Sequence, residues 1–197
     1  MGVKSDGIIY IHQYPELKGD ERAQIDDILQ NWVRPNPNLR IGQWTKKPKV
    51  DDLWELPWLD IILLDQHLST KDVEKVIGLV YKVHGKYFLN LELLNVMAVY
   101  KWVANEISEI NKIVYQELGG EPDPDYVAAG IEQLKDFDYS VALDQLAQGD
   151  PLRYDQLLRT PYTVIFRKLC LDNVWGDIRK NYQEIVSRKA KRGRRKS

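Results

Sequence analysis

The chain of 197 residues contains one cysteine, three histidines and no long apolar run. A single cysteine, Cys170, excludes an internal disulfide and any zinc site built from several thiolates. The histidines His12, His67 and His84 have none of the spacings of a zinc-binding helix. The longest apolar runs are four or five residues, whereas a membrane-spanning helix needs about 20. We therefore expect no metal and no membrane span and, since the first residues lack a signal-peptide core, no secretion.

The common signatures of enzymes are also missing. The sequence has no glycine-rich phosphate loop, no dinucleotide fingerprint and no nucleophile elbow. Arg167 and Lys168 could lower the pKa of the neighbouring Cys170 thiol, but the apolar residues around it favour a buried structural cysteine. The remaining enzymatic alternative is a site assembled from three residues that are close in sequence: Asp60, Asp65 and His67. We expect a non-enzymatic protein, without catalytic residues or a cofactor.

The aromatic composition favours a protein that works through its surfaces. There are 11 Tyr and six Trp against three Phe. Tyr and Trp suit positions that are apolar on one side and wet on the other, and they are enriched at protein interfaces. The length suits one domain with an arm and a tail.

Apolar residues recur at helical spacing through most of the chain, which predicts a mainly α fold, a multi-helix bundle. The longest stripe includes Val96, Val103, Ile107 and Ile110 and predicts a helix over 90–118. The other predicted helices, bounded by Pro, Gly, Asn and Asp, cover 16–33, 53–67, 70–84, 124–137, 139–148, 152–159 and 161–187. We divide the chain into an N-terminal arm (1–15), a helical body (16–187) with a hinge near 119–124, and a basic tail (188–197).

The N-terminal arm carries a short apolar segment. Residues 8–14 are β-branched and aromatic and are bounded by Gly7 and Pro15, which predicts one strand or extended arm. No hairpin partner follows, so the segment pairs either with a neighbouring chain or with its own domain. For the first alternative, the partner-binding residues are Ile8, Ile9, Tyr10 and Ile11.

A long proline-rich loop is predicted over 34–52. It contains Trp44 and a basic cluster of Lys46, Lys47 and Lys49. Long loops in compact proteins tend to be functional. Trp44 is therefore either a lid over the core or an exposed anchor for a partner.

The charge is unevenly distributed along the chain. The net charge is −1, yet residues 188–197 contain seven basic residues and no acid, which leaves 21 basic against 29 acidic residues in 1–187. Such a tail is either a solvated extension or a contact for a polyanion or an acidic protein. The polyanion-binding residues would be Arg188, Lys189, Lys191, Arg192, Arg194, Arg195 and Lys196. No aromatic side chain interleaves the tail, so it offers no base stacking. Any DNA contact by the tail would be without sequence specificity.

One stretch of the chain resembles small helical structural proteins of tailed bacteriophages. The likeness lies in the helix faces and turns of residues 141–158 and 161–169, with a similar pattern around 87–90 and 99–102, and it extends over about 55–186. The resemblance implies a connector, ring or tail component, or a tail-assembly chaperone. A protein of that class would bind copies of itself and other virion proteins, in the virion or the host cytoplasm.

These observations lead to one preferred function and one alternative. The preferred function is a non-enzymatic structural or assembly protein of a tailed-phage particle, acting through subunit contacts and not through a membrane. The alternative is a cytosolic adaptor or regulator that binds nucleic acid or an acidic partner through its basic tail.

Overall fold

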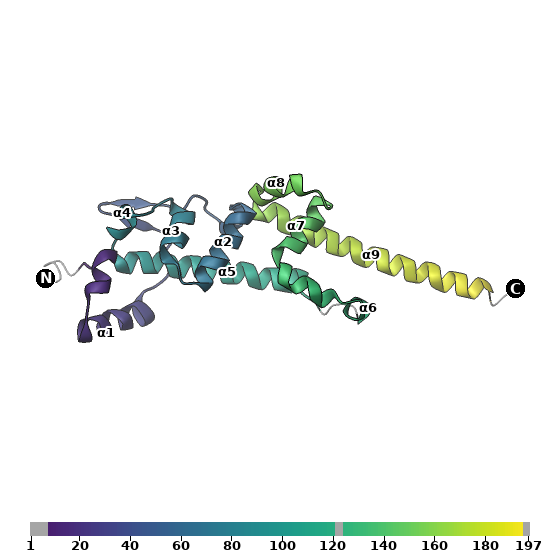
Figure 1. The fold of residues 1–197 in the computed structure, drawn as a ribbon, viewed down its shortest axis with the longest axis horizontal. Coiled ribbons are helices and arrows are strands. Elements are labelled where there is room, and N and C mark those ends of the chain that lie inside the picture. The colour runs from purple at the N-terminus through teal and green to yellow at the C-terminus, as the bar shows by residue number, and fades with distance from the viewer. Residues whose placement is uncertain (1–7, 121–123, 195–197) are drawn as a thin grey trace. The chain divides into compact units, whose positions relative to one another are not determined.

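A computed structural model describes residues 8–120 and 124–194, and within this part the protein is mainly helical (Figure 1), as the sequence predicts. Parts of the predicted arm (1–7), hinge (121–123) and tail (195–197) lie outside the described residues. The chain divides into two compact units, Met1–Asn111 and Lys112–Ser197. The boundary falls inside one long helix, ahead of the glycine pair where we predicted a hinge.

The first unit combines helices with one small hairpin. In chain order its elements are η1 (Ile11–Glu16), α1 (Gly19–Asp27), η2 (Ile28–Trp32), β1 (Leu39–Ile41), β2 (Trp44–Lys46), η3 (Leu53–Glu55), α2 (Trp58–Ser69), α3 (Val73–Tyr81), α4 (Lys86–Leu89) and the start of α5 (Leu93–Leu118). The predicted helices over 53–67, 70–84 and 90–118 correspond to α2, α3 and α5. The helix predicted over 16–33 starts later and ends in the π-helical turn η2.

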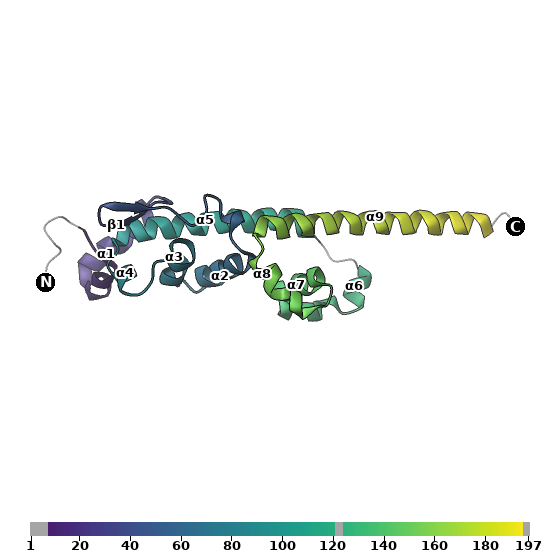
Figure 2. The ribbon, with the colours of Figure 1, turned by 90° about the horizontal axis from the view of Figure 1, so that it is seen from above.

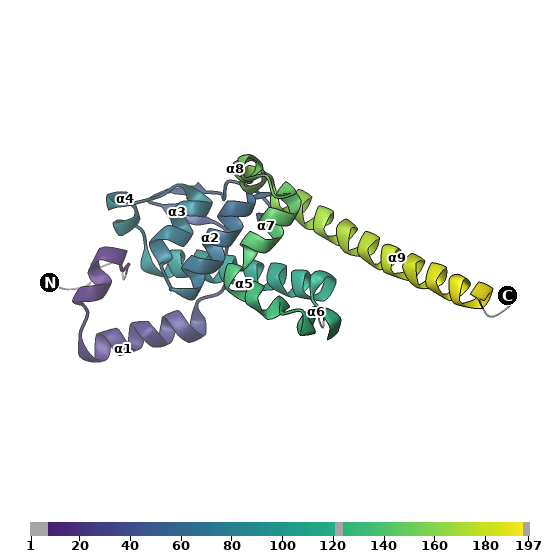
Figure 3. The same ribbon diagram turned by 45° about the vertical axis from the view of Figure 1, so that its right-hand side comes forward.

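The core of the first unit forms where α2 and α3 lie beside α5 (Figures 2 and 3). The α5 stripe is buried as predicted, with Val96, Val99 and Val103 fully enclosed. Two polar contacts link α2 to α5: Asn111 donates to the carboxylate of Asp65 at 2.8 Å, and the Tyr100 hydroxyl lies 3.5 Å from a carbonyl of α2. Burial of this apolar stripe supplies most of the stabilisation.

Local sequence signals set the helix ends. The Asp72 carboxylate accepts the backbone N–H of Lys75 at 3.3 Å and caps α3, and Lys75 also holds the pKa of that carboxyl below its usual range. Pro57 directly precedes α2, where its fixed φ suits a helix start. Lys82 ends α3 in the left-handed conformation, with a φ of 55°. Gly85 precedes α4.

Part of the predicted loop 34–52 is an ordered hairpin. The strands β1 and β2 pair antiparallel through a two-residue turn, in which Gly42 takes a φ of +61°. The side chain of Asn95 on α5 fixes the hairpin: it accepts the N–H of Arg40 at 2.5 Å and donates to the carbonyl of Asn38 at 3.0 Å. The hydroxyl of the buried Tyr81 donates to the carbonyl of Pro37, and burial raises its pKa. The loop is thus attached to the core.

The strand predicted over 8–14 is wrong for most of its length. Only Tyr10 forms a β-bridge, to Glu92, and the chain then turns into the 3-10 helix η1. Two backbone hydrogen bonds flank the bridge, from Leu93 to Ile9 and from Ile11 to Leu91. The Gln13 side chain then accepts the N–H of Tyr10 at 2.9 Å, which favours a tight turn over an extended strand.

The second unit consists of short helices and one long one. Its elements are the end of α5, α6 (Pro124–Ala128), η4 (Ile131–Phe137), α7 (Tyr139–Ala147), η5 (Pro151–Arg153), α8 (Tyr154–Arg159) and α9 (Tyr162–Arg194). Asp150 caps η5 by accepting the N–H of Leu152 at 3.1 Å, between the helices predicted over 139–148 and 152–159. The helix predicted over 161–187 continues to Arg194, so most of the predicted tail is helical.

A paired substitution on α2 tests the core of the first unit. Leu64 is fully buried and Leu59, on the same helix, is 37% exposed. We expect Leu64→Ala to lower the free energy of unfolding by roughly 2–5 kcal/mol and Leu59→Ala by less than about 1 kcal/mol. Urea denaturation followed by Trp fluorescence measures both, because five of the six Trp residues lie in the first unit. Equal losses for the two variants would contradict the assigned core.

Candidate interaction surfaces

The helix α9 carries a continuous row of exposed apolar side chains. Each is between 45% and 67% exposed: Val164, Leu171, Val174, Trp175, Ile178, Tyr182, Ile185 and Val186. The C-terminal part of α9 extends beyond α6, α7 and α8 of the same unit (Figure 1), so these elements do not cover the C-terminal part of the row. We call these eight residues the α9 seam.

The spacing of the α9 seam is that of a coiled-coil interface. Leu171, Ile178 and Ile185 are seven residues apart, and Trp175 and Tyr182 fall between them with the same period. Alternating three- and four-residue steps place these side chains on one face of a helix, where a second helix can interlock with them. The seam therefore has the geometry for binding another helix.

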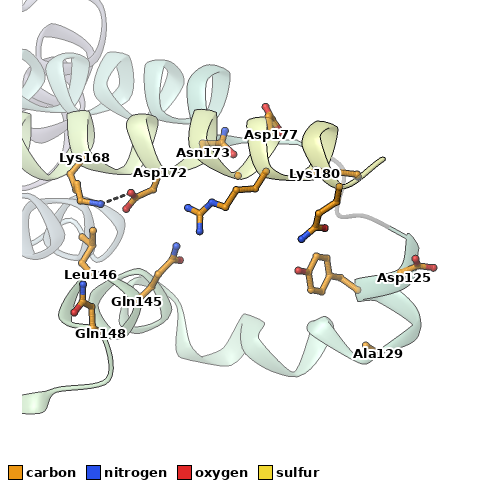
Figure 4. Close-up of a pocket in the computed structure, with 14 residues that line it drawn as sticks. Asp125, Ala129, Gln145, Leu146, Gln148, Lys168, Asp172, Asn173, Asp177 and Lys180 are labelled. Atoms are coloured by element: carbon orange, nitrogen blue, oxygen red, sulfur yellow. Dashed lines mark hydrogen bonds and ion pairs between the residues drawn. The ribbon is translucent and has the colours of Figure 1, made fainter. Parts of the chain in front are cut away.

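A wide polar groove lies between α9 and the α6–α7 region of the second unit (Figure 4). Its volume is about 1160 Å³, and its walls carry charges of both signs. Lys168 and Asp172 form an ion pair within α9, and Gln145 faces them from α7 (Figure 4). Mixed charges give the groove no single-sign field for attracting an ion. The described residues contain no group of three or more His, Cys, Asp or Glu side chains suited to a metal.

The predicted partner residues of the arm lie against their own chain. Ile8, Ile9, Tyr10 and Ile11 are all half-buried. The Ile9 carbonyl accepts the N–H of Leu93 at 2.8 Å, and the Ile11 N–H donates to the Leu91 carbonyl at 3.0 Å. The alternative in which the arm packs on its own domain is therefore the one observed in the single chain. Backbone pairing of these residues with another chain would first require these bonds to break.

The predicted anchor Trp44 lies on the hairpin and is 81% exposed. Of the two alternatives, an exposed anchor or a lid over the core, its position agrees with the first. Trp32, at the end of η2, is 74% exposed as well. Large exposed aromatic side chains are typical of surfaces that bind partners.

The predicted polyanion-binding residues begin on α9. Arg188, Lys189 and Lys191 are exposed, and Arg188 pairs with Glu184 at 2.9 Å. Arg192 and Arg194 belong to the helix, although their side chains lie outside the described part. Arg195 and Lys196 lie outside it entirely. The backbone of α9 spaces Arg188, Lys189 and Lys191 at about 1.5 Å per residue along the helix axis.

The three residues of the enzymatic alternative have structural partners. Asp60 forms an ion pair with Lys49 at 3.3 Å, and Asp65 accepts from Asn111. His67 lies in the last turn of α2. An ion pair thus accounts for Asp60, and a hydrogen bond between α2 and α5 accounts for Asp65.

Cys170 lies half-buried on α9. Burial, and then the negative charge of Glu117, raise the pKa of its thiol. The lowering that Arg167 and Lys168 could have caused is not observed. The neighbouring Asn173 is linked to the carbonyl of Glu117 at 3.5 Å, which holds the end of α5 close to this part of α9.

No family model, curated protein or solved structure matches the chain. No helix among the described residues combines the length and apolar content needed to cross a membrane. The interaction surfaces are therefore the basis for assigning a function.

The α9 seam is the surface that our sequence analysis did not identify. Its periodicity was visible as a helical stripe, but the same stripe is expected of a helix packed in a core. The seven-residue repeat of Leu171, Ile178 and Ile185 does not separate the two cases. The buried stripe of α5 has the same repeat in Val96, Val103 and Ile110, so only the exposure in the structure distinguishes the seam from a core helix.

The raised pKa of Cys170 leads to a reactivity prediction. A higher pKa leaves less thiolate near pH 8, so we expect iodoacetamide to alkylate Cys170 more slowly than it alkylates a cysteine peptide. The midpoint of the rate against pH should lie above that of the peptide. Because Glu117 contributes to the shift, Glu117→Gln should lower the midpoint. A midpoint below that of the peptide would contradict this environment.

Proposed function

We propose that the protein is a non-enzymatic structural or assembly subunit of a tailed-phage particle, in the virion or the host cytoplasm. It acts through contacts with copies of itself and with other virion proteins, as a connector, ring or tail component. The single observation that carries the proposal is the α9 seam, with its exposed apolar side chains at coiled-coil spacing.

The energetics of the seam favour an interface. Full burial of a large apolar side chain stabilises by about 1.5–3 kcal/mol. Burying the remaining half of a half-exposed side chain would therefore contribute roughly 1 kcal/mol. The eight seam residues together offer on the order of 8 kcal/mol per helix. Two such helices offer about twice that, which matches or exceeds the 4–15 kcal/mol estimated for the loss of freedom on association. A second seam is therefore a sufficient partner.

Exposed aromatic side chains outside the seam support the same class of function. In the first unit Trp32, Trp44 and Tyr87 are each at least 70% exposed, and in the second unit Tyr115 is 78% exposed. Such side chains give large contact areas at low conformational cost. Several distinct patches suit a subunit that contacts more than one neighbour.

The phage assignment within this proposal rests on the resemblance of residues 55–186 to small helical structural proteins of tailed phages. The structural features consistent with it are the helical body and the long helix α9. Ring and tail components are built from many copies of one chain, which requires surfaces that bind other copies of that chain.

A second candidate function is a cytosolic adaptor that binds nucleic acid or an acidic partner through the basic end of α9. The observation that favours it is that the basic residues continue an exposed helix and include Arg188 and Lys189. A helix with one basic end can lie along a phosphate backbone or an acidic groove.

Self-association is the direct test of the proposed function. We expect the full chain to form dimers or larger oligomers at micromolar concentration. Ile178→Asp places a charge in the middle of the seam and should weaken association at least tenfold, because the carboxylate would be buried without a partner. Sedimentation velocity across a dilution series measures the effect.

A matched control lies on the same helix. Ser187→Asp adds the same charge at an exposed position off the seam and should leave the association constant within about twofold. A wild-type chain that remains monomeric at 100 micromolar, or equal effects of the two substitutions, would refute the role of the seam.

The second candidate makes a separate prediction. A chain in which the seven basic residues of 188–196 are replaced by Gln should lose most of its affinity for duplex DNA of any sequence. For the unaltered chain, affinity should fall steeply as salt rises, because bound phosphates release counterions. Anisotropy titrations at several salt concentrations measure both. A chain that binds DNA equally well with and without these charges would exclude the tail as the contact.

A further inference from the structure

A small pocket in the first unit contains none of the residues of the α9 seam on which the proposed function rests. Its volume is about 300 Å³, and it lies between the hairpin and the loop that joins α3 to α4. Its lining consists of Ile41, Lys46, Lys82, Val83, His84 and Tyr87. The pocket thus combines cationic, apolar and aromatic side chains and has no carboxylate in its wall.

All the charged residues in the two segments that form the pocket are basic. Residues 39–47 contain Arg40, Lys46 and Lys47, and residues 82–90 contain Lys82 and Lys86; neither segment contains an acid. Lys49 and Lys75 elsewhere in this unit pair with carboxylates, whereas none of these five side chains does so within the described residues. Of the five, Lys46 and Lys82 line the pocket, so two cations far apart in the sequence meet there.

Aromatic side chains flank these charges. Tyr87 lines the pocket and is 70% exposed, with the Lys86 ammonium 5.5 Å from the centre of its ring. Trp44 pairs with Ile41 across the hairpin, and paired residues share a face of the ribbon. Trp44 and Lys46 are two positions apart on β2, so they also share that face. The pocket therefore lies next to two exposed rings.

The groups around the pocket are held in place. The Glu74 carboxylate accepts the N–H of Gly85 at 2.7 Å and fixes the loop against α3. The ring of His84 occupies space that only a glycine at position 78 leaves open, since any side chain there would collide with it. Asn95 fixes the hairpin on the other side. A preformed site of this kind loses little conformational freedom on binding a ligand.

From this arrangement we infer that the pocket binds one nucleotide unit of a single-stranded nucleic acid. Lys46 and Lys82 would contact the phosphate, and the exposed rings of Tyr87 and Trp44 would stack on bases. Basic grooves with interleaved aromatic rings are the usual means of binding single strands without strong sequence preference. A duplex keeps its bases stacked inside and would not offer them to these rings. A plain acidic peptide would use the lysines but not the rings.

The test measures the binding of a fluorescent 12-nucleotide oligothymidine to the full-length chain by anisotropy. The seven basic residues of 188–196 are replaced by Gln in every sample, which removes the charge of the tail. We expect the double variant Lys46→Gln, Lys82→Gln to bind at least tenfold more weakly and its salt slope to fall by about 1.4. Tyr87→Leu should weaken binding about tenfold, and Tyr87→Phe, which keeps the ring, should not.

The control for charge is Lys18→Gln with Arg34→Gln, which removes two exposed cations of the same unit outside the pocket. Circular dichroism confirms that each variant is folded. Unchanged binding by the double variant, or an equal loss in the control, overturns the proposal. Equal affinity for duplex DNA overturns it too, because that indicates a contact with the phosphate backbone alone. Equal affinity for poly-glutamate indicates a simple charge patch, and equal affinity for free thymidine monophosphate indicates a mononucleotide site; either result also overturns the proposal.

Discussion

The apolar face of α5 is the feature on which the first unit depends. Helices α2 and α3 are short, and helices of that length are marginal in water without packing. Burial of Val96, Val99 and Val103 gives them a surface to pack on, and the same helix holds the hairpin through Asn95. The hairpin has only three residues in each strand, so its position also depends on α5.

The long helix of the second unit contrasts with α5. Both carry an apolar stripe, but the stripe of α5 is enclosed in its first-unit part, whereas that of α9 is exposed from Val164 to Val186. An unpartnered stripe of this size is costly in a solitary soluble chain, because apolar side chains in water favour association. The proposal of a self-associating subunit follows from this difference.

The helices were predictable from sequence, because apolar periodicity and caps such as Asp72 are local signals. The arm was harder to predict. Residues 8–14 have the composition of a strand, but the number of backbone groups available to pair with them is a tertiary property, and only Tyr10 forms a bridge. Likewise, no local signal places Lys46 beside Lys82, since only the packing of the hairpin on the α3–α4 loop unites them.

Lys82 has two roles, since it ends α3 and also lines the pocket of the first unit. Its φ is 55°, in the left-handed region of the backbone. Glycine adopts this region without strain, whereas a residue with a side chain pays on the order of 1 kcal/mol of conformational free energy. A glycine at this position would relax the backbone and yet remove a cation from the pocket. Selection for thermal robustness and selection for ligand capture would therefore favour different residues at this single site.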